Sequence, residues 1–151
     1  MKRIQSADCV SLHIPKGVFA VKNNFKYDKK YKEYVFDNDD ILIYVECGEN
    51  QKDYAEKEVK RLLEWLTENH KSFAVEVSEL FFEFAENWDE WVDEGYSAEE
   101  FAEFLYPDEI EVCKDGSFSI CYECSLECLG EYRVIAEVSS DYKLEDAGVI
   151  G

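Results

Sequence analysis

The cysteines are the residues whose spacing comes nearest to that of a metal site. Cys121, Cys124 and Cys128 follow one another at intervals of three and four residues, and Cys113 lies upstream. Four thiolates can close a tetrahedral zinc site. Cys121, however, lies in a predicted strand, where residues three apart point to opposite faces, and no glycine separates the thiols. We therefore predict that the protein holds no metal and that these cysteines pack as small apolar side chains, with a structural zinc site as the alternative.

No other group of residues forms a catalytic set. A redox pair needs a helix N-terminus to lower the pKa of one thiol, whereas Cys121 and Cys124 end a predicted strand among glutamates. The two histidines, His13 on a strand face and His70 between helices, are expected at the surface. The chain contains no phosphate-binding glycine loop and no protease or kinase signature. We predict no enzyme activity and no cofactor, and an enzyme that uses the cysteines is the remaining alternative.

The clearest pattern is an acidic segment, residues 72–113, which holds fourteen Asp or Glu and no Lys or Arg among 42 residues. At 100° per residue, its glutamates fall on one stripe of a helix, opposite an apolar side. Like charges at this spacing cost roughly 0.2–0.5 kcal/mol per pair, so a helix shaped by stability alone would intersperse lysines. We predict that this glutamate stripe binds a basic partner, and the alternative is a solvated helix face. The stripe consists of Glu76, Glu79, Glu83, Glu86 and Glu90, and it is extended by Asp93 and Glu94 if the helix continues.

The charge of the chain restricts the class of partner. The formal net charge is −19, from 35 acidic and 16 basic residues. Residues 1–35 hold eight Lys or Arg against three Asp or Glu, so a more basic N-terminal segment precedes an acidic body. Such a body repels nucleic acid and anionic membranes, and its natural complement is a basic protein surface. We predict a basic protein partner, with no direct binding to nucleic acid and no binding to membranes.

The length and composition fit one folded domain. A chain of 151 residues can remove well over half of its unfolded surface from water, and 46% apolar with 15% aromatic residues is too rich for disorder. No apolar run approaches the roughly 18 residues of a spanning helix, and the first residues lack the apolar stretch of a signal peptide. These features predict a cytoplasmic protein with reduced thiols.

The apolar alternation predicts strands at the beginning of the chain. Val10–Ile14 and Val18–Val21 are expected to form a hairpin. Tyr31–Phe36 and Ile41–Cys47 are expected to pair around the polar turn Asp37–Asp40.

Helical spacing follows in the middle of the chain. Asp53–Asn69 and Phe73–Val92 are predicted as two helices. A third is predicted to begin at Ser97, whose hydroxyl forms a capping box with Glu100, and to be stopped by Pro107.

Strands return at the end of the chain. Ile110–Cys113 and Phe118–Tyr122 are predicted to form a hairpin around a two-residue Asp115-Gly116 turn. Tyr132–Val138 and Ala147–Ile150 complete the set. The predicted class is a single α+β domain over the whole chain, with an antiparallel β-sheet and about three α-helices packed on one of its faces.

The C-terminal half resembles a bacterial family known as domain of unknown function 2262. The resemblance covers about the last seventy residues and, more loosely, the helix before them. Members commonly carry a Leu-Phe-Trp-Gly-His stretch after the hairpin, where this chain matches only at Leu126 and Gly130 and has Glu131 at the histidine position. The resemblance implies an α+β fold and small stand-alone proteins, some of which look like immunity proteins paired with secreted toxins. The matching segments are Trp88–Trp91, Ser97–Phe101, Ile110–Phe118, Val134–Glu137 and Gly148–Gly151.

Charge, size and the lack of a catalytic set together favour an inhibitor that acts by binding. The first hypothesis is an immunity protein that neutralises a basic toxin, with a nuclease as the expected target. The alternative is a phage-type inhibitor that mimics nucleic acid and blocks a defence nuclease, as an anti-CRISPR protein does. A toxin gene directly upstream would favour the first, and a phage operon the second.

Overall fold

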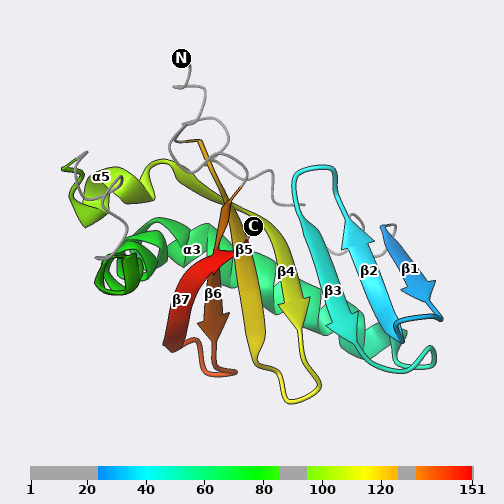
Figure 1. Ribbon diagram of the computed structural model, residues 1–151. Coiled ribbons are helices and arrows are strands. Elements are labelled where there is room, and N and C mark those ends of the chain that lie inside the picture. The colour runs from blue at the N-terminus through cyan, green and yellow to red at the C-terminus, as the bar shows by residue number, and fades with distance from the viewer. Residues whose placement is uncertain (1–23, 86–94, 126–131, 151) are drawn as a thin grey trace.

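Within the residues that the structure describes, seven strands form one sheet, in which their spatial order equals their order along the chain (Figure 1). The computed structural model describes residues 24–85, 95–125 and 132–150. The strands are β1 (Phe25–Asp28), β2 (Glu33–Asp37), β3 (Leu42–Glu46), β4 (Leu105–Val112), β5 (Phe118–Cys124), β6 (Arg133–Val138) and β7 (Leu144–Ile150). The helices in this part of the chain are α3 (Lys52–Ala85) and α5 (Ala98–Ala102).

The strand pairing confirms the α+β class and corrects one feature of the predicted sheet. Neighbouring strands are antiparallel, except that β3 and β4 are parallel. A parallel pair needs a long crossover, and here α3 and α5 lie between the two strands in the sequence. The sheet is therefore mixed rather than wholly antiparallel, because the helices carry the chain from the end of one strand back to the start of the next.

The first described strands follow the predicted alternation. The two strands expected around Asp37–Asp40 are β2 and β3, and the strand β1 in front of them was not predicted. The Asn38 side chain accepts a hydrogen bond from the amide of Ile41 at 2.8 Å, which closes the turn. The predicted hairpin Val10–Ile14 with Val18–Val21 lies outside the described residues.

A single continuous helix replaces the two predicted over residues 53–92, at least as far as Ala85, where the described part of α3 ends. It runs for 34 residues without a glycine or proline. Polar side chains near the expected break bond back to the preceding turn: Thr67 donates to the carbonyl of Leu63 at 2.7 Å, and Asn69 donates to that of Trp65 at 3.0 Å. They leave the backbone ladder intact. The described residues therefore contain two helices, whereas about three were predicted.

The core lies between α3 and one face of the sheet (Figure 1). Residues of α3 at helical spacing meet the alternate residues of each strand, because the periods of 3.6 and 2.0 place one apolar set on a single side of each element. The helix α5 joins this layer through Phe101, whose ring stacks on that of Phe81 with centroids 5.4 Å apart. The largest fully buried side chains are Tyr122, Phe36, Phe81, Phe118, Ile43, Leu62, Leu66, Leu105, Ile110, Ile120 and Val45.

The short helix α5 begins as predicted and ends earlier than expected. Ser97 accepts from the amide of Glu100 at 3.1 Å, and the Glu100 carboxylate accepts from the amide of Ser97 at 2.9 Å, which confirms the capping box. The helix stops at Ala102, however, and Pro107 lies inside β4. A register shift follows Pro107, which fits the rule that proline enters a sheet only where a ladder bond is absent.

Arg61 of α3 ties the helix layer to two turns of the sheet. Its guanidinium donates to the carboxylate of Glu58 at 2.8 Å, to the carbonyl of Gly116 at 2.8 Å and to the hydroxyl of Tyr142 at 3.0 Å. It also lies 5.8 Å from the ring centroid of Phe118 and 5.4 Å from that of Tyr142. One side chain thus holds both the β4–β5 turn and the β6–β7 turn against α3.

The β4–β5 turn differs in type from the predicted one. The amide of Gly116 donates to the carbonyl of Cys113 at 3.0 Å, and the amide of Cys113 donates to that of Ser117 at 2.9 Å. Gly116 has a φ of +88°, whereas Asp115 is not among the residues with positive φ. A two-residue turn of the expected type needs positive φ at both positions, so this is a three-residue loop that ends in a glycine bulge.

Replacing Gly116 with valine should destabilise the fold. Positive φ costs an L-residue roughly 1–2 kcal/mol, and a new Cβ would lie 3.3 Å from the Cβ of Ser140. The matched control is Gly148→Val, because a Cβ there meets no atom within 4 Å and a strand favours valine. Thermal unfolding of both variants checks this, and equal melting temperatures would contradict the assigned turn.

Replacing Tyr122 with phenylalanine should leave the free energy of unfolding unchanged or raise it. The Tyr122 hydroxyl is fully buried, and it lacks a hydrogen-bond partner among the residues that the structure describes. Removing a buried, unsatisfied hydroxyl relieves its desolvation penalty, which is roughly 1–3 kcal/mol. Tyr34→Phe is the control, since the Tyr34 hydroxyl donates to the carbonyl of Glu49 and its loss should cost about 1 kcal/mol. Urea unfolding measures the stability of both variants. A Tyr122→Phe variant less stable than Tyr34→Phe would contradict the prediction.

Candidate functional site

The face of the sheet that points away from α3 carries most of the strand carboxylates. Side chains alternate along each strand, so residues between the core positions share this outer sheet face. Its carboxylates are Asp28, Glu33, Asp37, Glu46, Glu109, Glu111, Glu123, Glu137 and Asp146. Its larger apolar side chains are Val35, Leu42, Tyr44, Cys121, Ile135 and Ile150.

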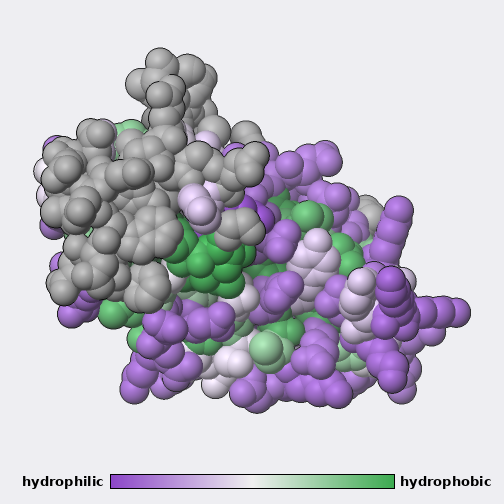
Figure 2. All heavy atoms as spheres, viewed as in Figure 1, coloured by the Kyte–Doolittle hydropathy of each residue, from purple (hydrophilic) through white to green (hydrophobic). Residues whose placement is uncertain are grey.

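The strand register brings these residues together from distant parts of the sequence. One row across the sheet joins Tyr44, Glu111, Ser119 and Glu137, and the next row includes the contact of Glu109 with Cys121. Figure 2 views the molecule from this side and shows hydrophilic residues over the described strands, with hydrophobic residues between them. The outer sheet face is therefore an acidic surface with an apolar interior.

The electrostatics of this face are unfavourable in the isolated protein. Partial burial raises the pKa of Glu33, and neighbouring carboxylates, first that of Asp28, raise it further. The pKa of Glu137 is raised in the same way, by burial and then by Asp146. Burial and the charge of Glu109 also raise the pKa of the Tyr44 phenol. Each group titrates above its usual range because it is partly buried and, second, because neighbouring carboxylates are negatively charged.

Few positive charges offset these carboxylates. Among the described strands, the basic residues at outward positions are Lys26 and Arg133. Arg133 forms an ion pair with Asp108 at the register shift in β4. Its charge is therefore already engaged by a carboxylate outside the main rows, and the face keeps a large negative excess.

The glutamate stripe lies on the other layer of the molecule. Glu76, Glu79 and Glu83 are exposed on α3, and the buried residues Val77 and Phe81 lie between them on its inner side. The apolar side of α3 packs on the sheet, so the stripe points away from the sheet and is not brought together with the outer sheet face. The remaining predicted members lie outside the described residues: Glu86, Glu90, Asp93 and Glu94.

The cysteines are separated by the pleat of β5. Cys124 lies on the core face opposite Leu105, and Cys121 lies on the outer face opposite Glu109. Burial raises the pKa of the Cys121 thiol to about 11, which keeps it protonated near neutral pH. Cys113 is exposed in the hairpin, and Cys128 lies outside the described residues. Within residues 24–85, 95–125 and 132–150, no three or more His, Cys, Asp or Glu side chains are grouped so that they could hold a metal ion.

The one histidine in the described part of the chain lies on α3, away from the outer sheet face. His70 is half-buried on α3, and its pKa is lowered by burial and then by the neighbouring Lys71. It is less exposed than the predicted surface position. His13 lies outside the described residues.

Comparisons with known proteins give no relative for this chain: no family model, no curated protein and no solved structure matches it. The resemblance to the domain of unknown function 2262 family therefore stays an expectation from the sequence. Within the described part of the chain, neither helix combines the length and the apolar character that crossing a membrane requires.

The stability of the protein should depend on pH with opposite signs at two glutamates. The raised pKa of Glu137 means that its contribution to stability is present at low pH and is lost as pH rises through the carboxyl range. Glu100 has a lowered pKa because it accepts from the Ser97 amide, so its contribution is present near neutral pH and is lost as pH falls.

The measurement is the melting temperature near pH 7 and near pH 4. Glu137→Gln should raise it near pH 7, with a smaller effect near pH 4. Glu100→Gln should lower it near pH 7, since the capping box is lost. A melting temperature of Glu137→Gln at or below that of wild type near pH 7 would show that Glu137 experiences no net destabilisation on the outer sheet face.

Proposed function

We propose that this protein is an acidic inhibitor that neutralises a basic protein toxin by direct binding, in the manner of a bacterial immunity protein. A nuclease is the preferred target class, because a surface that binds nucleic acid is itself basic. The observation that carries the proposal is the outer sheet face, on which carboxylates lie among apolar side chains, and where burial and then neighbouring carboxylates raise the pKa values of Glu33 and Glu137. The negative charge of the outer sheet face is complementary to the positive surface of such a target.

The composition of the outer sheet face supports binding to a protein rather than solubility alone. Protein interfaces commonly combine an apolar centre with a polar rim, and half-buried side chains such as Leu42, Tyr44 and Ile135 supply such a centre here. Opposite fields steer the encounter and set specificity. A basic partner would also relieve the repulsion around Glu33 and Glu137.

The glutamate stripe on α3 is proposed as a second contact. Glu76, Glu79 and Glu83 are exposed and follow one another at helical spacing, so a basic loop or helix of the target could lie along them. Because the stripe and the outer sheet face belong to different layers, a partner that covers the sheet reaches the stripe only by wrapping around the edge. We therefore assign the main contact to the sheet.

Mimicry of nucleic acid is the second candidate function. Carboxylates occupy alternate positions of β4, at Glu109 and Glu111, and Glu137 of β6 lies in the same row as Glu111, two strands away across β5, so the negative charge is spread in two dimensions over the face. Such an array suits the phosphate-binding groove of a defence nuclease, as with an anti-CRISPR protein. Both candidates act without catalysis and without a cofactor. Both place the protein in the cytoplasm, where thiols such as those of Cys47, Cys113 and Cys121 stay reduced.

A charge-reversal pair tests the proposal. Glu109→Lys with Glu111→Lys reverses two charges on the outer sheet face, and Glu64→Lys with Glu103→Lys makes the same change at exposed sites outside both acidic surfaces. A third variant, Glu79→Lys with Glu83→Lys, probes the stripe. Each tagged protein is used to capture partners from the native host, and the captured protein is identified, purified and titrated at two salt concentrations.

The sheet variant should bind the partner at least about tenfold more weakly, which corresponds to about 1.4 kcal/mol, and the control should match wild type. The loss should shrink at high salt, since exposed charges are screened beyond about 10 Å at 0.1 M. Co-expression with wild type, but not with the sheet variant, should restore growth that the partner arrests. An acidic partner, or equal affinity of the sheet variant and wild type at low salt, would refute the proposal.

A further inference from the structure

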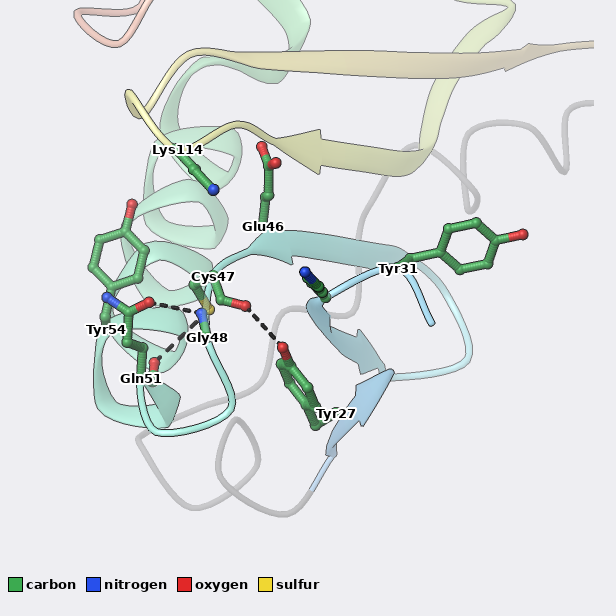
Figure 3. Close-up of a pocket in the computed structure, with 9 residues that line it drawn as sticks. Tyr27, Tyr31, Glu46, Cys47, Gly48, Gln51, Tyr54 and Lys114 are labelled. Carbon is green, nitrogen blue, oxygen red and sulfur yellow. Dashed lines mark hydrogen bonds between the residues drawn. The ribbon is translucent and has the colours of Figure 1, made fainter. Parts of the chain in front are cut away.

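A polar pocket opens at the β1 end of the molecule, where four separate segments meet. The β1–β2 turn, the loop after β3, the first turn of α3 and the β4–β5 turn enclose a volume of about 570 Å³ (Figure 3). Pockets that bind small molecules measure about 300–1,000 Å³, so this one is large enough for a ligand with a ring.

Two lysines line this pocket in a chain that is otherwise strongly acidic. Lys32 comes from the β1–β2 turn and Lys114 from the β4–β5 turn. Neither forms an ion pair with a carboxylate in the described part of the chain. Figure 3 shows the ammonium group of Lys114 directed into the space between Tyr54 and Glu46. The lining thus carries two positive charges against the single carboxylate of Glu46, so an anion in the pocket would be attracted to the lysines.

Neutral donors and aromatic rings complete the lining. The Gln51 Oε1 atom accepts from the amide of Gly48 at 2.7 Å, which orients the side chain and leaves its NH₂ group as a donor. Tyr27 donates to the carbonyl of Cys47 at 3.2 Å, which fixes its ring at the wall. Burial raises the pKa of Tyr54, so its phenol stays neutral and can donate.

We propose that this pocket binds a small organic oxyanion that carries a planar ring, with a phosphate monoester or a carboxylate as the anionic group. Lys32 and Lys114 would hold the anion, Gln51 and Tyr54 would donate to it, and the rings of Tyr27 and Tyr54 would pack against the ring of the ligand. Glu46 would accept a hydrogen bond from a hydroxyl or amino group of the ligand. The inference stands apart from the proposed inhibitor function, since only Glu46 belongs to both surfaces.

The experiment is a titration of the ¹⁵N-labelled full chain, followed by the amide shifts of Gly48, Gln51 and Lys114. The probes are adenosine monophosphate, benzoate, adenosine and inorganic phosphate. At least one of the first two should give saturable shifts confined to the pocket. It should also bind at least about tenfold more tightly than adenosine, which lacks the anionic group, and inorganic phosphate, which lacks the ring. The tighter of the two identifies the anionic group.

The lysine variants decide whether the pocket is the site. Lys32→Gln with Lys114→Gln should weaken binding at least about tenfold, and Lys71→Gln with Lys143→Gln, which remove the same charge at exposed positions elsewhere, should not. If the double variant does not fold, Lys114→Gln alone serves. Absence of saturable shifts with all four probes at 10 mM, or equal affinity of the pocket variant and the control, would overturn the proposal.

Discussion

The position of Arg61 is the constraint on which the arrangement of helix and sheet depends. A guanidinium that is only about a quarter exposed needs partners for its charge and its donors. Glu58 supplies the counter-charge from the preceding turn of α3, and the carbonyl of Gly116 and the hydroxyl of Tyr142 accept its other bonds. These contacts, chiefly those to Glu58, keep its pKa above the ordinary value. Both turns must therefore lie over α3, which also sets the place of Lys114 beside the pocket.

The same packing separates apolar from charged groups. Because α3 covers one face of the sheet, the period of two along each strand sends every second side chain to the opposite face. Acidic residues at those positions accumulate on one surface, where Glu33 and Glu137 titrate above their usual range. The fold tolerates this repulsion because α3 and the strands share one apolar core, whose burial stabilises the folded state. A surface that weakens the free protein in this way gains most from a partner of opposite charge.

The local sequence patterns predicted individual strands and a helix cap, but they did not predict the acidic face that the strand register assembles. The alternation in β2, β3, β5 and β6 and the reciprocal caps of Ser97 and Glu100 act within a few residues, so the sequence was sufficient. The first half of β4, from Leu105, was instead predicted as helix. The helix break expected near His70 was wrong because its polar neighbours bond to the preceding turn. The acidity of the outer sheet face was missed because each strand contributes only one or two carboxylates. Alternating acids such as Glu109 and Glu111 were the signal for it, although only the strand order assembles them.

The two proposed surfaces are compatible because their charges differ. The outer sheet face is acidic across the β2 to β7 strands, whereas Lys32 and Lys114 gather at the pocket near β1. The field of the protein therefore steers a basic partner toward the sheet and away from the lysines. A small oxyanion experiences the reverse preference and is attracted to the two lysines of the pocket. Binding at one surface thus leaves the other electrostatically available, and Glu46, which borders both, is the residue through which either ligand would affect the affinity for the other.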